Sequence, residues 1–176
     1  MTAPIASQEH RSQRNRAIWT AATAAMLVAL VGGVMTDIGP WYQSLRKPDW
    51  QPPDWLFGPA WTLIFTLAAI AGVKSWLRAP TQSDRDWIII LFAANGFLNV
   101  LWSLLFFRLK RPDWALIETG FLWLSVIVLI FALARYSKTA AWLLVPYAAW
   151  VTFASILNWK IVELNPDKIA AALALI

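Results

Sequence analysis

The sequence predicts an all-α membrane protein, a bundle of five transmembrane helices with a Pro/Trp-rich loop between helices 1 and 2. Of its 176 residues, 59% are hydrophobic, and the mean hydropathy of +0.54 is far above that of a soluble domain. Charged residues are absent from four long stretches, and a fifth contains one acid, Glu118; the stretches are 17–36, 55–73, 87–107, 139–159 and 114–134. Each has about twenty residues, which at ~1.5 Å per residue cross the ~30 Å hydrocarbon core of a bilayer.

The first sixteen residues are polar and basic, and they predict a disordered tail before a first helix over about 17–36. Basic residues ahead of an apolar run also suit a signal peptide, but twenty uncharged residues exceed the usual apolar segment of such a peptide. Within the first helix a small residue recurs at every fourth position, which favours close packing against another helix. These small residues are Ala21, Ala25, Ala29 and Gly33.

The loop over 37–56 is expected to be stiff. From Pro40 to Thr62 the chain holds four tryptophans, one tyrosine and five prolines within twenty-three residues. Proline fixes φ and removes a backbone donor, which excludes an uninterrupted helix or a paired strand. Tryptophan is enriched at membrane interfaces and where a flat ligand is covered. Two interpretations stay open: a lid over a binding site, or an anchor loop that positions two helices at the membrane surface.

The second helix is predicted over about 57–77, and Pro59 fits its first turn, where no amide donor is needed. Aromatic and small side chains share one of its faces at helical spacing, namely Trp61, Phe65, Ala68 and Gly72. The spacing alone favours ordinary helix packing for this face over the wall of a binding site.

The third helix is predicted over about 87–107, with a helix start at Ser83 to Asp86. It carries Asn95 and Asn99 one turn apart, and Trp102 follows. An amide inside a membrane needs a hydrogen-bonding partner, so these side chains are expected to face the bundle interior. They serve either as a link between helices or as a polar contact in a cavity.

The fourth helix is predicted over about 113–134, where Glu118 is read as a structural or interfacial acid rather than a proton relay. The fifth is predicted over about 139–162, with a kink at Pro146. Four of its residues share a face: Trp150, Ala154, Leu157 and Asn158. Residues 166–176 are assigned to a C-terminal tail.

Composition excludes several kinds of site. The chain has no cysteine and a single histidine, His10, in the polar N-terminal segment, so no metal site is predicted. The net charge of +5 is scattered over the helix ends and forms no basic stripe, and no nucleic-acid partner is expected. The sequence also lacks a phosphate-binding loop, a nucleophile elbow and a paired carboxylate.

Two groups of residues resemble the signature of the translocator protein family, also called the TspO or peripheral benzodiazepine receptor family. The first group is Trp41, Tyr42, Leu45, Lys47, Pro48, Trp50, Pro52, Pro53, Pro59 and Trp61. The second has the spacing Pro-Tyr-x-x-Trp-x-x-Phe-Ala-x-x-Leu-Asn, from Pro146 to Asn158. Between them, further matches are Leu98, Asn99, Trp102, Phe106, Phe107, Trp114, Ala115 and Leu116. The resemblance covers roughly residues 20–165.

The resemblance implies a membrane receptor or carrier for porphyrins such as protoporphyrin IX or haem, and for benzodiazepine-type ligands. It requires no cofactor, since the porphyrin is the ligand. The expected ligand-binding residues are Trp41, Trp50, Phe57, Trp61, Phe65, Asn99, Trp102, Trp114, Tyr147, Trp150 and Ala154. Charge placement adds Arg46 and Lys47 as contacts for the propionates of a porphyrin.

Three alternatives accompany this hypothesis. The family is reported to degrade porphyrin in light and oxygen, which would make Trp61 and Trp150 catalytic although no conventional catalytic motif is present. A sterol transporter is the second, but the tyrosine of the sterol segment is missing after Asn158, where Trp159 and Lys160 follow. The third is a scaffold whose tryptophans only anchor it in the bilayer.

The expected partners are the lipid bilayer, a flat apolar ligand and, by resemblance, a second copy in a homodimer. The expected location is a bacterial membrane, or the mitochondrial outer membrane in a eukaryote. The orientation is not fixed by the positive-inside rule, because the two sides carry eight and seven lysines and arginines.

Overall fold

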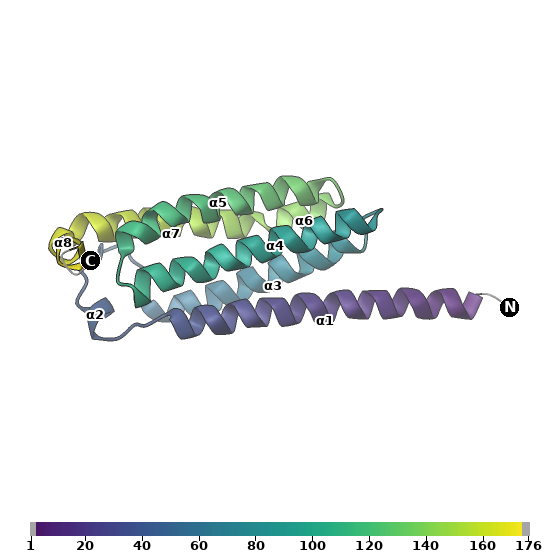
Figure 1. Ribbon diagram of the computed structural model, residues 1–176, viewed down its shortest axis with the longest axis horizontal. Helices are drawn as coiled ribbons and strands as arrows, with labels where there is room; N and C mark the ends of the chain where they lie inside the picture. The colour runs from purple at the N-terminus through teal and green to yellow at the C-terminus, as the bar shows by residue number, and fades with distance from the viewer. Residues whose placement is uncertain (1–2, 174–176) are drawn as a thin grey trace.

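The computed structural model describes residues 3–173, which are almost entirely helical (Figure 1). The long helices are α1 (Ala3–Met35), α3 (Phe57–Trp76), α4 (Gln82–Ser103), α5 (Pro112–Ala134) and α7 (Val145–Leu164). Shorter helices are α2 (Pro40–Gln43), α6 (Lys138–Leu143) and α8 (Pro166–Leu173), with single turns η1 (Asp54–Leu56) and η2 (Leu104–Arg108).

Five helical segments are long and apolar enough to cross a membrane, and the chain is an integral, multi-pass membrane protein. They are Arg11–Met35, Asp54–Trp76, Gln82–Arg108, Pro112–Ala134 and Lys138–Leu164. Their contacts close a ring in which α1 lies between α3 and α4, while α6 and α7 lie between α3 and α5. The all-α fold class predicted from the neutral stretches is confirmed.

The predicted disordered tail over 1–16 is wrong for the residues that the structure describes, because α1 begins at Ala3. Pro4 lies in its first turn, where proline is tolerated, and the following alanine, glutamine, glutamate and arginine residues favour a helix. Figure 1 shows the N-terminal part of α1 extending beyond the ends of α3 and α4. The C-terminal tail, too, is helical from Pro166 to Leu173.

Two other helices differ from their predicted bounds. Helix α4 begins at Gln82 because the Thr81 hydroxyl caps it, accepting from the Asp84 amide while the Asp84 carboxylate accepts from the Thr81 amide. The predicted fifth helix over 139–162 is divided at Leu144 into α6 and α7. Pro146 lies directly after this one-residue interruption, in the first turn of α7, where its missing amide donor is not needed.

Asn158 connects the last two long helices. With its amide oriented to satisfy both neighbours, it donates to the Pro112 carbonyl at 3.1 Å and accepts from the Leu116 amide at 3.0 Å. It is only 1% exposed, so these hydrogen bonds satisfy an otherwise buried amide. They fix the N-terminal turn of α5 against α7 beside the loop over 37–56, which we call the lid loop.

Candidate ligand-binding cavity

A cavity of about 1090 Å³ lies between α1 and the rest of the bundle, with walls from α3, α4, α5 and α7. Its lining is mostly apolar, as expected for a site inside a membrane. The lid loop closes one end, where Tyr42, Gln51 and Asp54 belong to the lining. Of the charged residues that the structure describes, Asp54 and Lys74 line the cavity, near its opposite ends.

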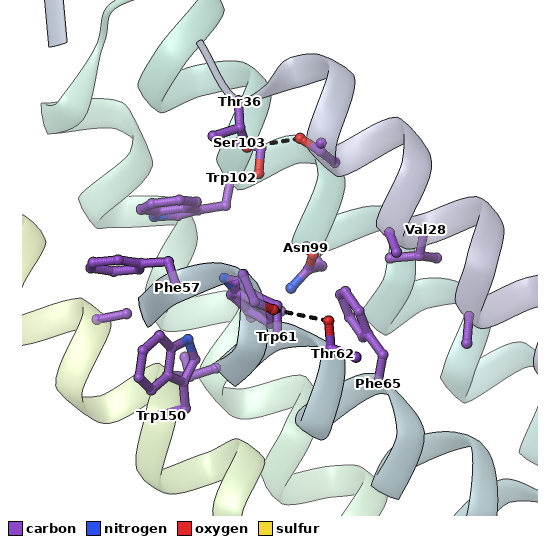
Figure 2. A pocket seen from close by; sticks show the side chains of 18 of the residues that line it. Val28, Thr36, Phe57, Trp61, Thr62, Phe65, Asn99, Trp102, Ser103 and Trp150 are labelled. Carbon is purple, nitrogen blue, oxygen red and sulfur yellow. Dashed lines mark hydrogen bonds between the residues drawn. The ribbon is translucent and has the colours of Figure 1, made fainter. Parts of the chain in front are cut away.

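Aromatic rings form the wall next to the lid (Figure 2). Trp61 stacks on Phe65 with ring centroids 5.2 Å apart, one helical turn along α3. The edge of Trp61 meets Trp150 of α7 at 6.3 Å, and Phe57 meets Trp150 at 5.6 Å. These edge-to-face pairs hold the two indoles in fixed orientations, because each ring limits the rotamers of the next.

Helix α4 supplies the facing wall. Trp102 stacks on Phe106 at 5.1 Å, and Asn99 lies one turn before Trp102 (Figure 2). Ala154 of α7 also lines the cavity, where its small side chain leaves space beside Trp150. The cavity therefore has indole rings on three helices, α3, α4 and α7, with the Asn99 amide next to Trp102.

Tyr147 lies behind the aromatic wall and contacts both Trp61 and the asparagines of α4. It is 2% exposed and packs edge-on against Trp61 at 6.0 Å. Its hydroxyl donates to Asn95 Oδ1 at 3.1 Å and accepts from Asn99 Nδ2 at 3.3 Å. Asn95 Nδ2 in turn donates to Ser125 Oγ at 2.8 Å. This chain of hydrogen bonds joins α4, α5 and α7, so the two asparagines predicted to face the interior do so and find partners there.

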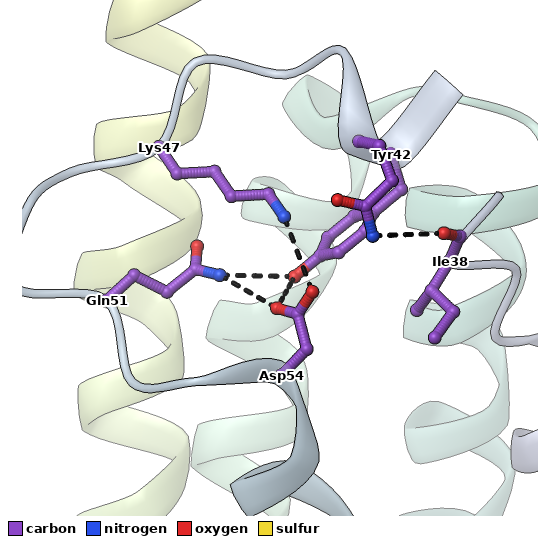
Figure 3. Close-up of polar contacts among 6 residues, drawn as sticks. Ile38, Tyr42, Lys47, Gln51 and Asp54 are labelled. Atoms are coloured by element: carbon purple, nitrogen blue, oxygen red, sulfur yellow. Dashed lines mark hydrogen bonds and ion pairs between the residues drawn. The ribbon is translucent and has the colours of Figure 1, made fainter. Parts of the chain in front are cut away.

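The lid loop is closed by a polar cluster, which we call the latch: Tyr42, Lys47, Gln51 and Asp54 (Figure 3). The Tyr42 hydroxyl donates to Asp54 Oδ1 at 2.9 Å, and Gln51 Nε2 donates to the same oxygen at 3.1 Å. Lys47 Nζ lies 3.6 Å from Asp54 Oδ2 and 3.6 Å from the centre of the Tyr42 ring. The latch thus ties the two ends of the loop together directly above the cavity.

The pKa of Tyr42 is raised above its ordinary value of 10.0 by burial and then by the neighbouring Asp54 carboxylate. A raised folded-state pKa contributes stability below the unfolded pKa and loses it as the pH rises toward the folded pKa. We therefore expect the free energy of unfolding of wild type minus that of Tyr42→Phe to be constant up to about pH 10. Above that it should fall by about 1.4 kcal/mol per pH unit. Denaturation in detergent at a series of pH values measures it, and a difference that stays constant to pH 11 contradicts the latch.

Seven of the predicted ligand-binding residues line this one cavity: Phe57, Trp61, Phe65, Asn99, Trp102, Trp150 and Ala154. Tyr147 supports the wall without lining it. Trp41 packs against Phe106 at 6.1 Å and Trp50 against Phe153 at 5.9 Å, so both belong to the packing of the lid loop on the bundle.

Trp114 lies outside the cavity, contrary to the prediction. It is 44% exposed in the first turn of α5, and the Arg111 guanidinium lies 4.2 Å from its ring centre. The two residues predicted to contact the propionates, Arg46 and Lys47, have different surroundings. Lys47 is engaged with Asp54 in the latch, whereas the Arg46 side chain is exposed and its backbone is hydrogen-bonded to the Asn165 side chain.

Several lining residues were not predicted. Asp54 and Gln51 carry the signal of polar side chains inside a proline-rich loop, next to a helix start. The small residues of α1 were read only as a packing surface, and all four of them line the cavity. Their size leaves open space beside α3, which the spacing alone does not distinguish from close packing.

Comparison with known proteins agrees with this architecture. The profile of the TspO/MBR family matches residues 20–164. Tryptophan-rich protein TspO of Chlorobaculum tepidum is 38% identical over 157 residues, 86% of this chain and 99% of that protein. A protein of the same name from Archaeoglobus fulgidus is 38% identical over 144 residues, 81% of this chain and 92% of its own. The translocator protein of Bos taurus is 32% identical over 126 residues, 71% of this chain and 75% of that protein. With five membrane-spanning helices and a match over most of its length, the chain belongs to the TspO/MBR family.

Proposed function

We propose that the protein is a membrane receptor or carrier for porphyrins, such as protoporphyrin IX or haem, and for synthetic benzodiazepine-type ligands. The observation that carries the proposal is the aromatic end of the cavity, where Trp61 and Trp150 meet edge to face opposite Trp102. A flat apolar ring system is matched by indole faces on two sides and excludes water from both. The rest of the lining is largely aliphatic, which suits a molecule that arrives from the membrane.

The lid loop gives the ligand a defined orientation. Three of its four lining residues are polar, so the polar edge of a porphyrin is directed toward the latch and its apolar edge toward the centre of the bundle. The Asp54 carboxylate at this end disfavours a ligand carboxylate unless a cation accompanies it. Arg46, exposed on the lid loop, supplies that cation in the proposal, while Lys47 neutralises Asp54.

A titration with protoporphyrin IX tests the proposal. We expect saturable quenching of tryptophan emission at one porphyrin per chain, because indoles line the site itself. An unrelated five-helix membrane protein in the same detergent serves as the control for partition into micelles. Quenching that rises linearly with porphyrin, as it does for that control, would remove the proposed function.

A further inference from the structure

The cavity is longer than the aromatic site. Along α3 its lining extends from Phe57 to Lys74. Along α1 it extends from Ile18 to Thr36, the residue that follows the helix. Each stretch has close to twenty helical residues, or roughly 30 Å, about the thickness of the hydrocarbon core. The aromatic rings occupy only the part next to the lid, from Phe57 to Phe65. A porphyrin bound there leaves the far half of the cavity unfilled.

The far half, which we call the α1/α3 groove, is lined by aliphatic and small side chains. These residues are Ile18, Ala21, Ala22, Ala25, Met26, Thr66, Ala69, Ile70, Val73 and Lys74. The groove contains no ring on which a flat molecule could stack. Ile18, Met26 and Ile70 are 45%, 62% and 44% exposed, so the groove is continuous with the lipid-facing surface. A flexible hydrocarbon chain can therefore enter it sideways between the two helices.

The basic side chain of Lys74 lines the groove at the end opposite the lid. Lys74 makes no hydrogen bond or ion pair with the residues that the structure describes, and it is only partly exposed. Helices α1 and α3 run antiparallel, so Arg14 and Arg16, just before Ile18, lie at the same level of the membrane as Lys74. Arg78, one turn after Lys74, donates instead to the Ser137 hydroxyl between α5 and α6. An anion at the mouth of the groove would face basic side chains from both helices.

The distribution of charge between the two ends of the bundle also favours an anion at the mouth of the groove. In sequence, the half of the bundle opposite the lid carries eight lysines and arginines and three acids, whereas the lid half carries seven lysines and arginines and seven acids, Glu118 included. The acids opposite the lid are Glu9, Asp84 and Asp86. Asp84 is already bonded to Thr81 and Tyr136, and Asp86 to Gln82. The net positive charge therefore lies on the face opposite the lid, where the groove opens, and it attracts anionic lipid to that face.

From this combination we propose that the α1/α3 groove binds an anionic phospholipid, with an acyl chain along Ala25 and Ile70 and the phosphate beside Lys74. Burying a chain in a groove lined by small residues gains contact area that open bilayer lipid does not have. The ammonium group supplies the selection between headgroups, since a zwitterionic lipid presents no net charge to it. This inference does not depend on porphyrin binding, which uses the other end of the cavity.

The test is lipid retention. The protein is reconstituted in nanodiscs that contain equal amounts of phosphatidylglycerol and phosphatidylcholine, extracted into detergent, and analysed by native mass spectrometry. We expect bound phosphatidylglycerol in preference to phosphatidylcholine. Lys74→Gln should lower retained phosphatidylglycerol about fivefold, the effect of one lysine near a membrane surface. Lys138→Gln removes an exposed charge from the same face, away from the groove, and should leave retention unchanged.

A second pair of variants tests the chain rather than the headgroup. Ala25→Phe fills the groove, and we expect it to lower retention of both lipids. Ala24→Phe adds the same ring to the neighbouring exposed position, which does not line the cavity, and should behave as wild type. The proposal is overturned by equal retention of the two lipids in wild type. Equal effects of Lys74→Gln and Lys138→Gln, or of Ala25→Phe and Ala24→Phe, overturn it as well.

Discussion

Replacing Trp150 by alanine should weaken protoporphyrin IX binding about 30-fold. Trp150 packs against Phe57 at 5.6 Å, Phe153 at 5.5 Å and Trp61 at 6.3 Å. Its removal takes away one aromatic wall and frees the rings that it holds. Truncating a buried tryptophan at the centre of a binding site commonly costs about 2 kcal/mol or more, which is the factor expected here. The change is measured by titrating the porphyrin absorbance band, which does not depend on protein fluorescence.

Two variants separate binding from general effects on the membrane protein. Trp142→Ala removes an indole that is 72% exposed, and it should bind porphyrin as wild type does. Trp150→Phe keeps a ring in the wall and should fall between wild type and Trp150→Ala. If Trp150→Ala and Trp142→Ala bind equally well, the aromatic end of the cavity is not the porphyrin site.

The fold was predictable from charge placement because a membrane imposes one rule on every helix. Long neutral stretches must be helical to satisfy their own backbone, so their number gave the five spans. The neutral stretches mark where the chain leaves the hydrocarbon core, but they do not determine where each helix ends. Helix α1 continues outward to Ala3 through polar residues, because those residues favour a helix in water as well.

The cavity was predictable in part, and the reason differs between residues. Trp61, Asn99 and Trp150 share faces with other polar or small residues, and tertiary packing brings those faces together. Trp114 is also a tryptophan, but it lies in the first turn of α5, where its ring is partly exposed and lies against the Arg111 guanidinium. No periodicity distinguishes an indole that faces a cavity from one that faces a headgroup region, because both are half-buried in apolar surroundings.

The hydrogen bonds in the bundle interior join residues far apart in sequence. Removing one of them is expected to cause a large loss of stability. Asn95→Leu should lower the free energy of unfolding by about 2 kcal/mol. The substitution leaves the buried Tyr147 hydroxyl without its acceptor and removes the donor to Ser125. Water cannot replace either contact inside the bundle. Thermal or denaturant unfolding in detergent measures the loss. Ser155→Ala, which removes a hydrogen bond only within α7, should change stability by much less.

A double substitution shows whether Asn95 and Tyr147 act through each other. Tyr147→Phe alone leaves Asn95 Oδ1 and Asn99 Nδ2 without their partner, so it is also destabilising. Once Tyr147 is phenylalanine, however, Asn95→Leu no longer abandons a buried hydroxyl. The double variant should therefore lose about 1 kcal/mol less than the two single losses added together. Strict additivity would mean that each side chain stabilises the bundle by its own packing, and that the hydrogen bond behind Trp61 does not hold the wall of the cavity in place.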